Sequence, residues 1–485
     1  MAETLKEKTA KGLLWGGLSN GLLQLLSALF GIILLHLLTP ADYGKIAVLL
    51  IFSGIASNLQ ESGFIAALCN KRDASHDDYN AVFWFNIIIS GILYIGLWLA
   101  SPLIADFYHE PVLTNLARYL FLGFLFSAFG TVQRAYLYSH MMVKQSSCIN
   151  IISLILSNTI GVIMAWNGFA FWGLATQTVC YVVFAQIGNW YVSPWRPTFQ
   201  INMRPAFEMF KFSSKLLITN LFGQLNSHVF SVLLGNNYDN TVVGHYSNAR
   251  KWNDMALYTI NGMISGVAQP VLAEILKSSD EDARERYCKV FRKMLRFTSF
   301  VSFPCMLGLG LIAPEFIHIV AGEKWAESAP LLSMLCIYGA FYPINLLYSH
   351  MTVSRGRSGI NMFCTIALCL IIWAGLICLS SWGLYQMITF FIIVNIAWLG
   401  VWQFFAWRMI RLSFWSVIKD IIPFFIFATI VMLVTWFVTQ HIDNMVLRLI
   451  SKIVIAVILY CGITFVSGAK IMRESIDYVL KKKTK

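Results

Sequence analysis

The sequence predicts an all-α membrane protein with about fourteen transmembrane helices, arranged as two pseudo-symmetric parallel six-helix bundles plus a C-terminal helix pair. Three observations lead to this fold class: an apolar composition, a series of membrane-length apolar segments, and an internal repeat. Of the 485 residues, 58% are hydrophobic and 12% are charged, whereas a soluble domain is about half apolar and about a quarter charged. A water-soluble core could not bury that excess, so the chain is expected to lie in a bilayer.

The apolar segments have the length that a bilayer requires. A transmembrane helix needs roughly 20 mainly apolar residues to cross a hydrocarbon core about 30 Å thick. Between turn-like breaks, fourteen windows meet this standard, near residues 12–38, 44–66, 80–105, 113–139, 148–166, 168–190, 207–234, 243–274, 293–320, 328–353, 360–380, 382–407, 417–439 and 446–468. We refer to them as predicted helices 1 to 14.

Basic residues gather in every second connection between these windows. The basic connections and tail contain Lys71, Arg72, Lys144, Arg196, Arg204, Arg355 and Arg357, the segments 277–296 and 408–419, and Lys481, Lys482, Lys483 and Lys485. The opposite connections contain a single Lys or Arg, Lys324. Because short cytoplasmic loops carry the excess of Lys and Arg, both termini are predicted to be cytoplasmic. The net charge of +12 is therefore a topology signal and does not predict a nucleic-acid partner.

Several classes of function are disfavoured by what the sequence contains. No connection on the outer side is long enough to fold as a domain, which argues against polymerases and ligases that use a large external loop. The ten cysteines are scattered singly, without the spacing of a zinc or redox site. No phosphate-binding loop or metalloprotease motif is present. We therefore expect a protein that is not an enzyme, with no catalytic residues, no metal and no cofactor.

Prolines mark the predicted linker between the two halves. Pro194, Pro197 and Pro205 cannot continue a helix, and they cluster within a short basic segment. The expected organisation is an N-terminal bundle at 1–192, a cytoplasmic linker at 193–205, a C-terminal bundle at 206–412, and helices 13 and 14 with a basic tail at 413–485.

Residues 278–298 are predicted to form an amphipathic cytoplasmic helix at the membrane interface. The segment opens with Ser278 and Glu281, which have the spacing of a capping box. Apolar side chains then follow one helical stripe beside basic ones, as in interfacial helices. The stripe consists of Tyr287, Val290, Phe291, Met294 and Leu295, and the basic residues are Arg284, Arg286, Lys289 and Arg292. The alternative is a solvated charged loop.

The first part of the internal repeat has a constant offset of 200 residues. Residues 20–44 match residues 220–244 in the pairs Asn20/Asn220, Gln24/Gln224, Leu25/Leu225, Ser27/Ser227, Phe30/Phe230, Leu34/Leu234 and Gly44/Gly244. An apolar composition would match some leucines by chance, but it would not keep Asn, Gln, Ser and Gly in register. This agreement indicates a duplication.

The second part of the repeat has an offset of 210. Residues 137–141, Leu-Tyr-Ser-His-Met, recur at 347–351, and Trp172-Gly173-Leu174 recurs from Trp382. Because six helices per unit is an even number, both halves enter the membrane from the same side, as in parallel-repeat transporters. The repeat therefore predicts a path between the halves and an alternating-access transport mechanism.

Polar side chains line one face of two repeat-related helices. Asn20, Gln24 and Ser27 are spaced i, i+4 and i+7 on predicted helix 1, and predicted helix 7 carries the same pattern. The second set is Asn220, Gln224 and Ser227. Uncharged polar groups in a membrane need partners, either on another helix or in a water-filled cavity. Both interpretations remain open, and all six residues are candidates for substrate binding.

Charged residues inside the windows are the other candidates. A charge near the bilayer centre costs about 2.5–3.5 kcal/mol and usually faces a protein interior. The candidates are Glu61, Arg134, Arg250, Lys251 and Asp254. An intrahelical Arg250–Asp254 pair and snorkelling to the headgroups are the simpler explanations. We expect at least one of the three cations to line the path, as a substrate-binding residue.

None of these charges is duplicated between the halves. At the repeat offset of 200, Glu61 corresponds to Asn261, and Asp254 corresponds to Gly54. This asymmetry indicates that the two halves have specialised. Glu61 and Asp254 are candidates for carrying a coupling proton or Na⁺.

Short motifs then point to a family. Residues 38–44, Leu-Thr-Pro-Ala-Asp-Tyr-Gly, resemble the junction between the first two helices of bacterial polysaccharide transporters. Residues 61–64, Glu-Ser-Gly-Phe, resemble their acidic turn near the end of helix 2. Residues 244–249 and 269–272 resemble the start and end of their helix 8. The resemblance extends over essentially the whole chain in helix order and count.

This family belongs to the multidrug/oligosaccharidyl-lipid/polysaccharide exporter superfamily, with the flippases of lipid-linked O-antigen and capsule repeat units. The resemblance implies two bundles in a V shape, with helices 1, 2, 7 and 8 around a central cavity, in the bacterial inner membrane. It implies an undecaprenyl-diphosphate-linked oligosaccharide as cargo, and a cationic cavity that Arg250, Lys251 and Arg134 fit by position. Membrane lipid, a polysaccharide polymerase and other assembly proteins are the implied partners, and helices 13 and 14 would hold the polyprenyl tail.

The resulting hypothesis is an alternating-access flippase for lipid-linked oligosaccharides. Arg250 and Lys251 would contact the anionic head, and the two polar stripes would contact sugar hydroxyls. A multidrug extruder of the same fold and a non-transporting membrane scaffold of a polysaccharide assembly complex remain alternatives. A glycosyltransferase is disfavoured because the chain has no soluble catalytic region.

Overall fold

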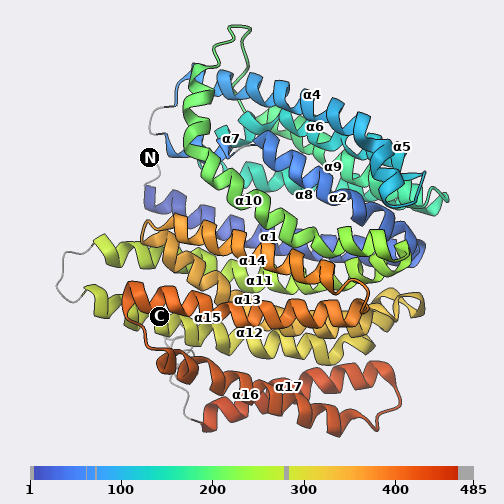
Figure 1. Ribbon diagram of the computed structural model, residues 1–485, viewed down its shortest axis with the longest axis vertical. Helices are drawn as coiled ribbons and strands as arrows, with labels where there is room; N and C mark the ends of the chain where they lie inside the picture. Colours follow the sequence, from blue (N-terminus) through green and yellow to red (C-terminus); the bar gives the residue numbers. More distant parts are fainter. Residues whose placement is uncertain (1–4, 62, 72–73, 278–282, 468–485) are drawn as a thin grey trace. The chain divides into compact units, whose positions relative to one another are not determined.

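The computed structural model describes residues 5–61, 63–71, 74–277 and 283–467 (Figure 1). Within these ranges the secondary structure is helical and falls into two compact units, Met1–Ser247 and Asn248–Lys485. The helices up to the end of the first unit are α1 (Leu5–Leu37), α2 (Pro40–Glu61), α3 (Phe64–Asn70), α4 (His76–Phe107), α5 (Leu113–Leu120), α6 (Leu122–Ala128), α7 (Thr131–Ser139), α8 (Val143–Trp166), α9 (Phe171–Val192) and α10 (Arg204–Asn237).

Helix α11 (Asn240–Lys277) begins in the first unit and continues into the second. The remaining elements are α12 (Ala283–Ala321), the 3-10 helix η1 (Glu323–Trp325), α13 (Ser328–Ser354), α14 (Ser358–Cys378), α15 (Leu384–Ile410), α16 (Phe414–Thr439) and α17 (Met445–Val466). The predicted all-α membrane fold is therefore confirmed. The predicted domain limits stay predictions.

Each predicted window coincides with helix, but two windows are broken. The window 44–66 covers most of α2 and the start of α3, which are separated at Gly63, where φ is 71°. The window 113–139 contains α5, α6 and α7, with a bend of 44° before α7. A transmembrane helix can be interrupted where its unpaired backbone N–H and C=O groups are buried in the protein and find hydrogen-bond partners there.

Nine described helices are long and apolar enough to cross a membrane, and the bent segment α5–α7 makes a tenth. Helices α2, α9, α10 and α11 have sufficient length but are more polar. Three of them, α2, α10 and α11, correspond to predicted helices 2, 7 and 8, which the resemblance places around a central cavity. The count of about fourteen spans and the cytoplasmic position of the termini stay predictions.

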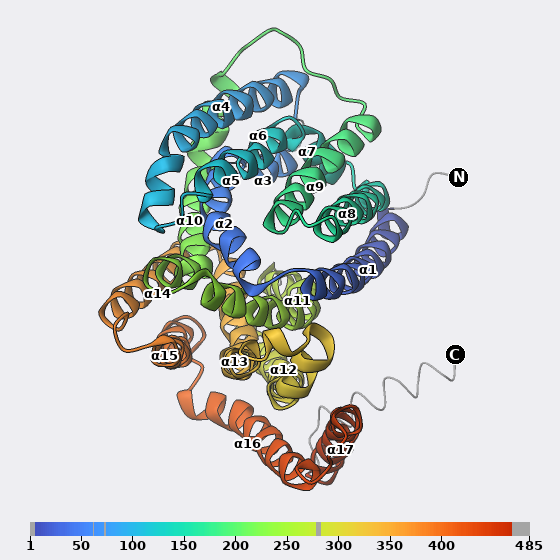
Figure 2. The same cartoon turned by 90° about the vertical axis from the view of Figure 1, so that its right-hand side faces the viewer.

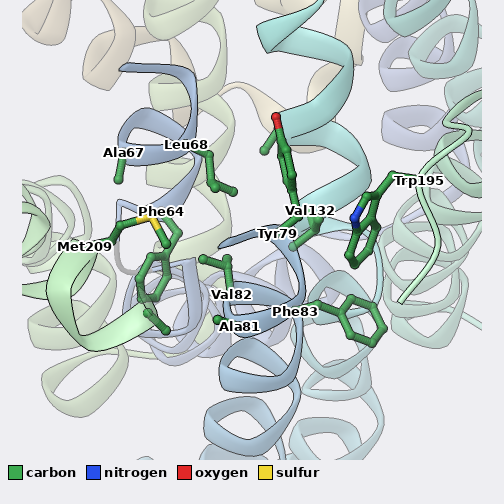
Figure 3. Packing of buried hydrophobic residues seen from close by; sticks show 12 residues of the cluster. Phe64, Ala67, Leu68, Tyr79, Ala81, Val82, Phe83, Val132, Trp195 and Met209 are labelled. Atoms are coloured by element: carbon green, nitrogen blue, oxygen red, sulfur yellow. The ribbon is translucent and has the colours of Figure 1, made fainter. Parts of the chain in front are cut away.

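The first unit has an aromatic core where α3, α4 and α7 meet the linker. Tyr79, Phe83 and Trp195 are buried there with Phe64 and Val132 (Figure 3). The ring centres of Tyr79 and Phe83 lie 6.1 Å and 5.7 Å from that of Trp195. Trp195 belongs to the predicted linker, so part of that linker is a component of the core.

Hydrogen bonds hold the linker against α4. The buried Asn80 side chain accepts a bond from the Thr198 N–H (2.9 Å) and donates to the Gln200 carbonyl (2.7 Å). Trp84 Nε1 donates to the Thr198 carbonyl at 2.8 Å. Since these contacts satisfy backbone groups that a free loop would expose to water, the linker is fastened along α4 as far as Gln200.

The two repeats meet at a close backbone crossing within the first unit. A Cβ added at Gly44 would lie 1.9 Å from the Asn240 carbonyl oxygen, and one at Gly244 would lie 1.8 Å from the Pro40 carbonyl oxygen. Gly44 and Gly244 are partners in the sequence repeat, and so are residues 40 and 240 at the same offset. The contact is therefore reciprocal, as expected where two copies of one structural unit meet about a pseudo-two-fold axis.

Helix α11 begins directly at this crossing. Thr241 Oγ1 donates to the Asp239 carboxylate at 2.7 Å, and this bond holds the pKa of that carboxyl below its usual range. The carboxylate therefore stays ionised beside the first backbone N–H groups of α11, where a negative charge is favourable.

The predicted interfacial segment is continuous with α12. Residues 283–298 form the start of this 39-residue helix, and Tyr287, Phe291 and Leu295 are buried. Tyr287 Oη lies 2.9 Å from Ser354 Oγ at the end of α13, and Phe291 packs edge-on against Tyr348 of the same helix. Tyr287 and Phe291 of the apolar stripe therefore contact α13, and the interfacial position of the segment stays a prediction. Ser278 and Glu281, the predicted capping box, lie outside the described residues.

Helices α16 and α17 pack against α12 and against each other in the second unit (Figure 2). Aromatic pairs fill the seam between α12 and α16, with ring centres 5.9 Å apart for Phe300 and Phe424 and 5.4 Å for Phe303 and Phe425. The C-terminal pair is therefore attached to one specific helix of the second bundle.

Candidate functional site

Glu61 and Arg134 form an ion pair between the end of α2 and α7. Arg134 Nη2 lies 2.8 Å from Glu61 Oε2, and the two side chains are 36% and 39% exposed. Beside them, Gln60 Nε2 donates to Thr131 Oγ1 at 2.9 Å in a buried contact. Because the ion pair is partly exposed, it contributes little to stability, about 0–1 kcal/mol. The charge pair therefore lies in a partly accessible position.

Arg250 and Asp254 form the intrahelical pair considered from the sequence. Arg250 Nε lies 2.9 Å from Asp254 Oδ2, and the Arg250 guanidinium lies 5.8 Å from the centre of the Tyr338 ring on α13. Asn253 Nδ2 also donates to Asp254 Oδ1 at 3.3 Å. The positive charge of Arg250 is thus compensated within α11.

Lys251 lacks the compensation that the other two cations have. Its side chain is partly buried on α11, and Asp254, one turn further on, is bound to Arg250. Across the described ranges, no carboxylate forms an ion pair with Lys251, and its ammonium makes no hydrogen bond. An uncompensated charge in a membrane helix is costly and usually marks a ligand path.

Neighbouring side chains hold this part of α11 in place. Trp252 Nε1 donates to Asn248 Oδ1 at 3.0 Å, and the Trp252 ring packs edge-on against Phe316 of α12 at 4.9 Å. Asn248 Nδ2 donates to Ser328 Oγ of α13 at 3.4 Å. These contacts anchor α11 against α12 and α13 next to Lys251.

The two polar stripes do not bond to neighbouring helices within the described structure. Asn20, Asn220 and Ser227 are exposed, and Gln24, Ser27 and Gln224 are half-exposed. None of the six forms a hydrogen bond with another described residue. On α1, the adjacent Ser19 bonds α8 instead, through Ser147 Oγ at 2.8 Å. Amides without protein partners need water inside a membrane, so this arrangement favours the cavity-lining interpretation over helix-to-helix contact.

Sequence reasoning missed two charge clusters on α12. Glu315 pairs with Lys452 of α17 at 2.7 Å, and Arg448 lies 3.8 Å from the same carboxylate oxygen. At the other end of α12, Arg292 and Arg296 share Asp420 of α16. Glu315, Lys452 and Asp420 each stand inside or beside an apolar window, which was the signal available in the sequence.

No group of His, Cys, Asp and Glu side chains suited to a metal ion occurs in the ranges that the structure describes. The candidates for substrate binding are cations, amides and hydroxyls, and Glu61 and Asp254 add carboxylates beside two of the cations. Cations, amides and hydroxyls bind anions and sugar hydroxyls through charge-assisted and neutral hydrogen bonds.

The chain is similar to known proteins of polysaccharide biosynthesis. A family model described as polysaccharide biosynthesis protein matches residues 33–330, which is more than half of the chain. The lipopolysaccharide biosynthesis protein WzxC of Escherichia coli is 23% identical over 364 residues, covering 74% of this chain and 72% of that protein. The succinoglycan biosynthesis transport protein ExoT of Rhizobium meliloti is 21% identical, covering 93% and 91%.

Two solved structures share the fold. The lipid II flippase MurJ in an inward closed conformation has a TM-score of 0.75 at 13% identity, covering 96% of this chain and all of that chain. An inward-facing multidrug resistance transporter of the MOP superfamily has a TM-score of 0.58 at 15% identity, covering 85% and 94%. The chain belongs to the polysaccharide biosynthesis protein family, and it has the fold of the lipid II flippase and of the multidrug transporters of the MOP superfamily.

Proposed function

We propose that this protein is a flippase that moves an undecaprenyl-diphosphate-linked oligosaccharide repeat unit across the bacterial inner membrane by alternating access. Family membership supports a role in polysaccharide biosynthesis, and the similarity to ExoT, a succinoglycan biosynthesis transport protein, supports transport. The likeness to MurJ supports a fold that can carry a lipid-linked cargo. The two halves, 1–192 and 206–412, would rock about the linker 193–205.

The observation that carries the proposal is the uncompensated Lys251. A diphosphate is a multiply charged anion, and Lys is a compact cation that binds phosphate well. Arg134 and Arg250 already have carboxylate partners, whereas none of the described carboxylates pairs with Lys251. We assign Lys251 the first contact with the anionic head, and Arg250 a second contact that competes with Asp254.

The polar stripes have the chemistry for the sugar. Asn and Gln amides both donate and accept hydrogen bonds, and so match sugar hydroxyls of either role. The exposed Asn20 and Asn220 are repeat partners on α1 and α10. Helices α2, α10 and α11, in their described parts, are less apolar than the helices that are long and apolar enough to cross a membrane. We therefore place the sugar path along these helices.

Glu61 and Asp254 are the proposed coupling groups. Each is a carboxylate held by an arginine, at 2.8 Å and 2.9 Å. A proton or Na⁺ on either carboxylate would weaken its ion pair and release the arginine for the cargo. Arg134 would then act as a secondary substrate contact. The polyprenyl tail would lie along α16 and α17, and the proposed partners are a polysaccharide polymerase and other assembly proteins.

The test is export in a strain that lacks its own flippase. We expect the Lys251→Gln variant to restore less than a tenth of the surface polysaccharide that the unchanged protein restores, at equal membrane abundance. The matched control is Lys289→Gln, because Lys289 is exposed and pairs with Glu285 at 2.6 Å on the outer face of α12. Full export by Lys251→Gln would overturn the assignment of Lys251.

The same strains separate the rival functions. A multidrug extruder would raise resistance to cationic drugs without restoring polysaccharide. A non-transporting scaffold would restore polysaccharide equally with the Lys251→Gln variant and the unchanged protein. Accumulation of lipid-linked repeat units in cells that carry the variant would support the flippase.

A further inference from the structure

One end of α12 carries more positive charge than its partners neutralise. Arg292 binds Asp420 of α16 with two bonds, Nε to Oδ2 at 2.7 Å and Nη2 to Oδ1 at 3.1 Å. Arg296 is one turn further along α12, and its Nε lies 3.8 Å from Asp420 Oδ1. Two guanidinium groups therefore share one carboxylate, so the cluster of Arg292, Arg296 and Asp420 has a net charge of +1.

Of the two arginines, Arg296 is the one whose hydrogen-bond donors are not all used. Asp420 is 4% exposed and already accepts both bonds from Arg292. Arg296 Nε is buried and has no hydrogen-bond partner, although the side chain as a whole is 37% exposed. A buried donor without an acceptor is costly, and the exposed part of a guanidinium can donate two hydrogen bonds to an anion. Arg296 therefore has hydrogen-bond donors that Asp420 does not occupy.

The surrounding surface increases the positive field. Between Arg284 and Arg296, α12 carries six basic side chains and one acidic side chain, Glu285, which pairs with Lys289. Lys293, which follows Arg292 in the chain, is exposed, and so is Lys419, which precedes Asp420. A concentration of exposed Lys and Arg at a membrane end attracts anionic headgroups, by about 1 kcal/mol per residue near the surface in other membrane proteins.

The position of the cluster marks a membrane boundary. Arg292, Arg296 and Phe300 follow one helical stripe of α12, and the seam with α16 changes there from ionic to aromatic. Phe297, next to Arg296, is 43% exposed, and Trp415 near the start of α16 is 70% exposed. Aromatic side chains of this kind gather at headgroup level.

The second cluster on α12 supports the same placement. Arg296 and Glu315 are 19 residues apart in one continuous helix, which at about 1.5 Å per residue is roughly 28 Å. A hydrocarbon core is about 30 Å thick. The two ionic clusters therefore fit the two faces of one bilayer, and the basic connections predict that Arg296 is on the cytoplasmic side.

We propose that Arg296, with Arg292 and Lys293, binds the phosphate of an anionic phospholipid in the cytoplasmic leaflet, at the junction of α12 and α16. Arg292 keeps the carboxylate of Asp420 occupied, so that Arg296 offers its guanidinium to the phosphate. Phe297 and Trp415 contact the upper acyl chains. This lipid is distinct from the transported cargo, and the proposal does not depend on Lys251.

The test uses the full-length protein purified in a mild neutral detergent. Phosphatidylglycerol and phosphatidylcholine are added separately, and bound lipid is counted by native mass spectrometry. We expect saturable binding of phosphatidylglycerol, and binding about fivefold weaker in Arg296→Gln. Arg296→Gln retains the Arg292–Asp420 bonds, so the fold is expected to persist. The matched control Lys289→Gln removes an exposed charge of the same helix that pairs with Glu285, and its loss of phosphatidylglycerol binding is expected to be clearly smaller than that of Arg296→Gln.

Two results would overturn the proposal. One is equal phosphatidylglycerol binding by Arg296→Gln and the unchanged protein. The other is displacement of the lipid by millimolar inorganic phosphate, which would mean that the site takes a free anion. Polysaccharide export by the same variants is measured in parallel, and loss of lipid binding with retained export separates this proposal from the transport function.

Discussion

Gly44 and Gly244 lie at a reciprocal backbone crossing, where each glycine faces the residue that stands four positions before the other. A Cβ would lie 1.9 Å from the Asn240 carbonyl oxygen at one glycine and 1.8 Å from the Pro40 carbonyl oxygen at the other. No side chain can be added at such distances without moving a backbone. The repeat conserved within the chain therefore has a physical reason at this pair: each copy has to leave space for the other.

Alanine at Gly44 is expected to destabilise the protein, because the neighbouring atom is a carbonyl oxygen of the backbone and cannot rotate away. Overpacking of this kind costs about 1–3 kcal/mol or more. The measurement is the thermal unfolding temperature of the purified variant in detergent. The control is Gly223→Ala on α10, where no atom lies within 4 Å of the added Cβ. An unchanged unfolding temperature for Gly44→Ala would contradict the crossing.

Replacing Asn80 with Ala is expected to free the linker from α4. The substitution removes the two bonds to the backbone of Thr198 and Gln200, and a typical hydrogen bond contributes about 0.5–1.5 kcal/mol. Limited chymotrypsin digestion of the folded protein should then cut faster after Phe199, an exposed linker residue that is followed by Gln200. Asn202→Ala is the control, because exposed Asn202 bonds only the nearby Arg204 N–H in the described structure. Equal cutting rates in both variants would show that the linker is held by other contacts.

Substitution within the Glu315–Lys452 pair is expected to lower the unfolding temperature more than substitution of the nearby Arg448. Both side chains of the pair are nearly buried, at 4% and 6% exposed, and Lys452 Nζ also donates to the Leu311 carbonyl at 3.1 Å. Removing one member of a buried pair costs about 3–5 kcal/mol. Lys452→Met should therefore lower the unfolding temperature strongly.

Arg448→Met should have a smaller effect on the same measurement. Arg448 is 30% exposed and lies 3.8 Å from Glu315, and its Nε is bonded to the Ile442 carbonyl. The reverse order of the two variants would show that Arg448, and not Lys452, neutralises Glu315.

Glu61→Gln is expected to separate stability from transport. The ion pair with Arg134 is more than one-third exposed on each side, so its loss should change the free energy of unfolding by less than about 1 kcal/mol. If Glu61 carries the coupling ion, polysaccharide export should fall at least tenfold in the same variant. A fall in export that tracks a fall in membrane abundance would instead assign a structural role.

Much of the fold was predictable because periodicity and apolar length are local properties of the chain. The windows near 12–38 and 446–468 coincide with α1 and α17, since a helix of that length and composition has few alternatives in a bilayer. Breaks were less visible. Gly63 and the bend before α7 depend on local backbone geometry, which an average over a window hides.

The candidate charges were predictable, but most of their partners were not. The spacing of Arg250 and Asp254 is enough to suggest their contact, because a helix brings residues four apart together. Glu61 and Arg134 are 73 residues apart, and no sequence pattern relates them. The pairing of Glu315 with Lys452 across 137 residues was missed for the same reason.

The amino-acid sequence was sufficient for the membrane class, the repeat and the residues that could carry chemistry, because these follow from composition and from spacing along one helix. Which cations are neutralised depended on packing between helices far apart in the chain. Lys251 stands out only after Arg134 and Arg250 are seen with their carboxylates. Tertiary contacts likewise place the apolar stripe of residues 283–298 against α13. The sequence could not decide this, because lipid and protein can both bury an apolar surface.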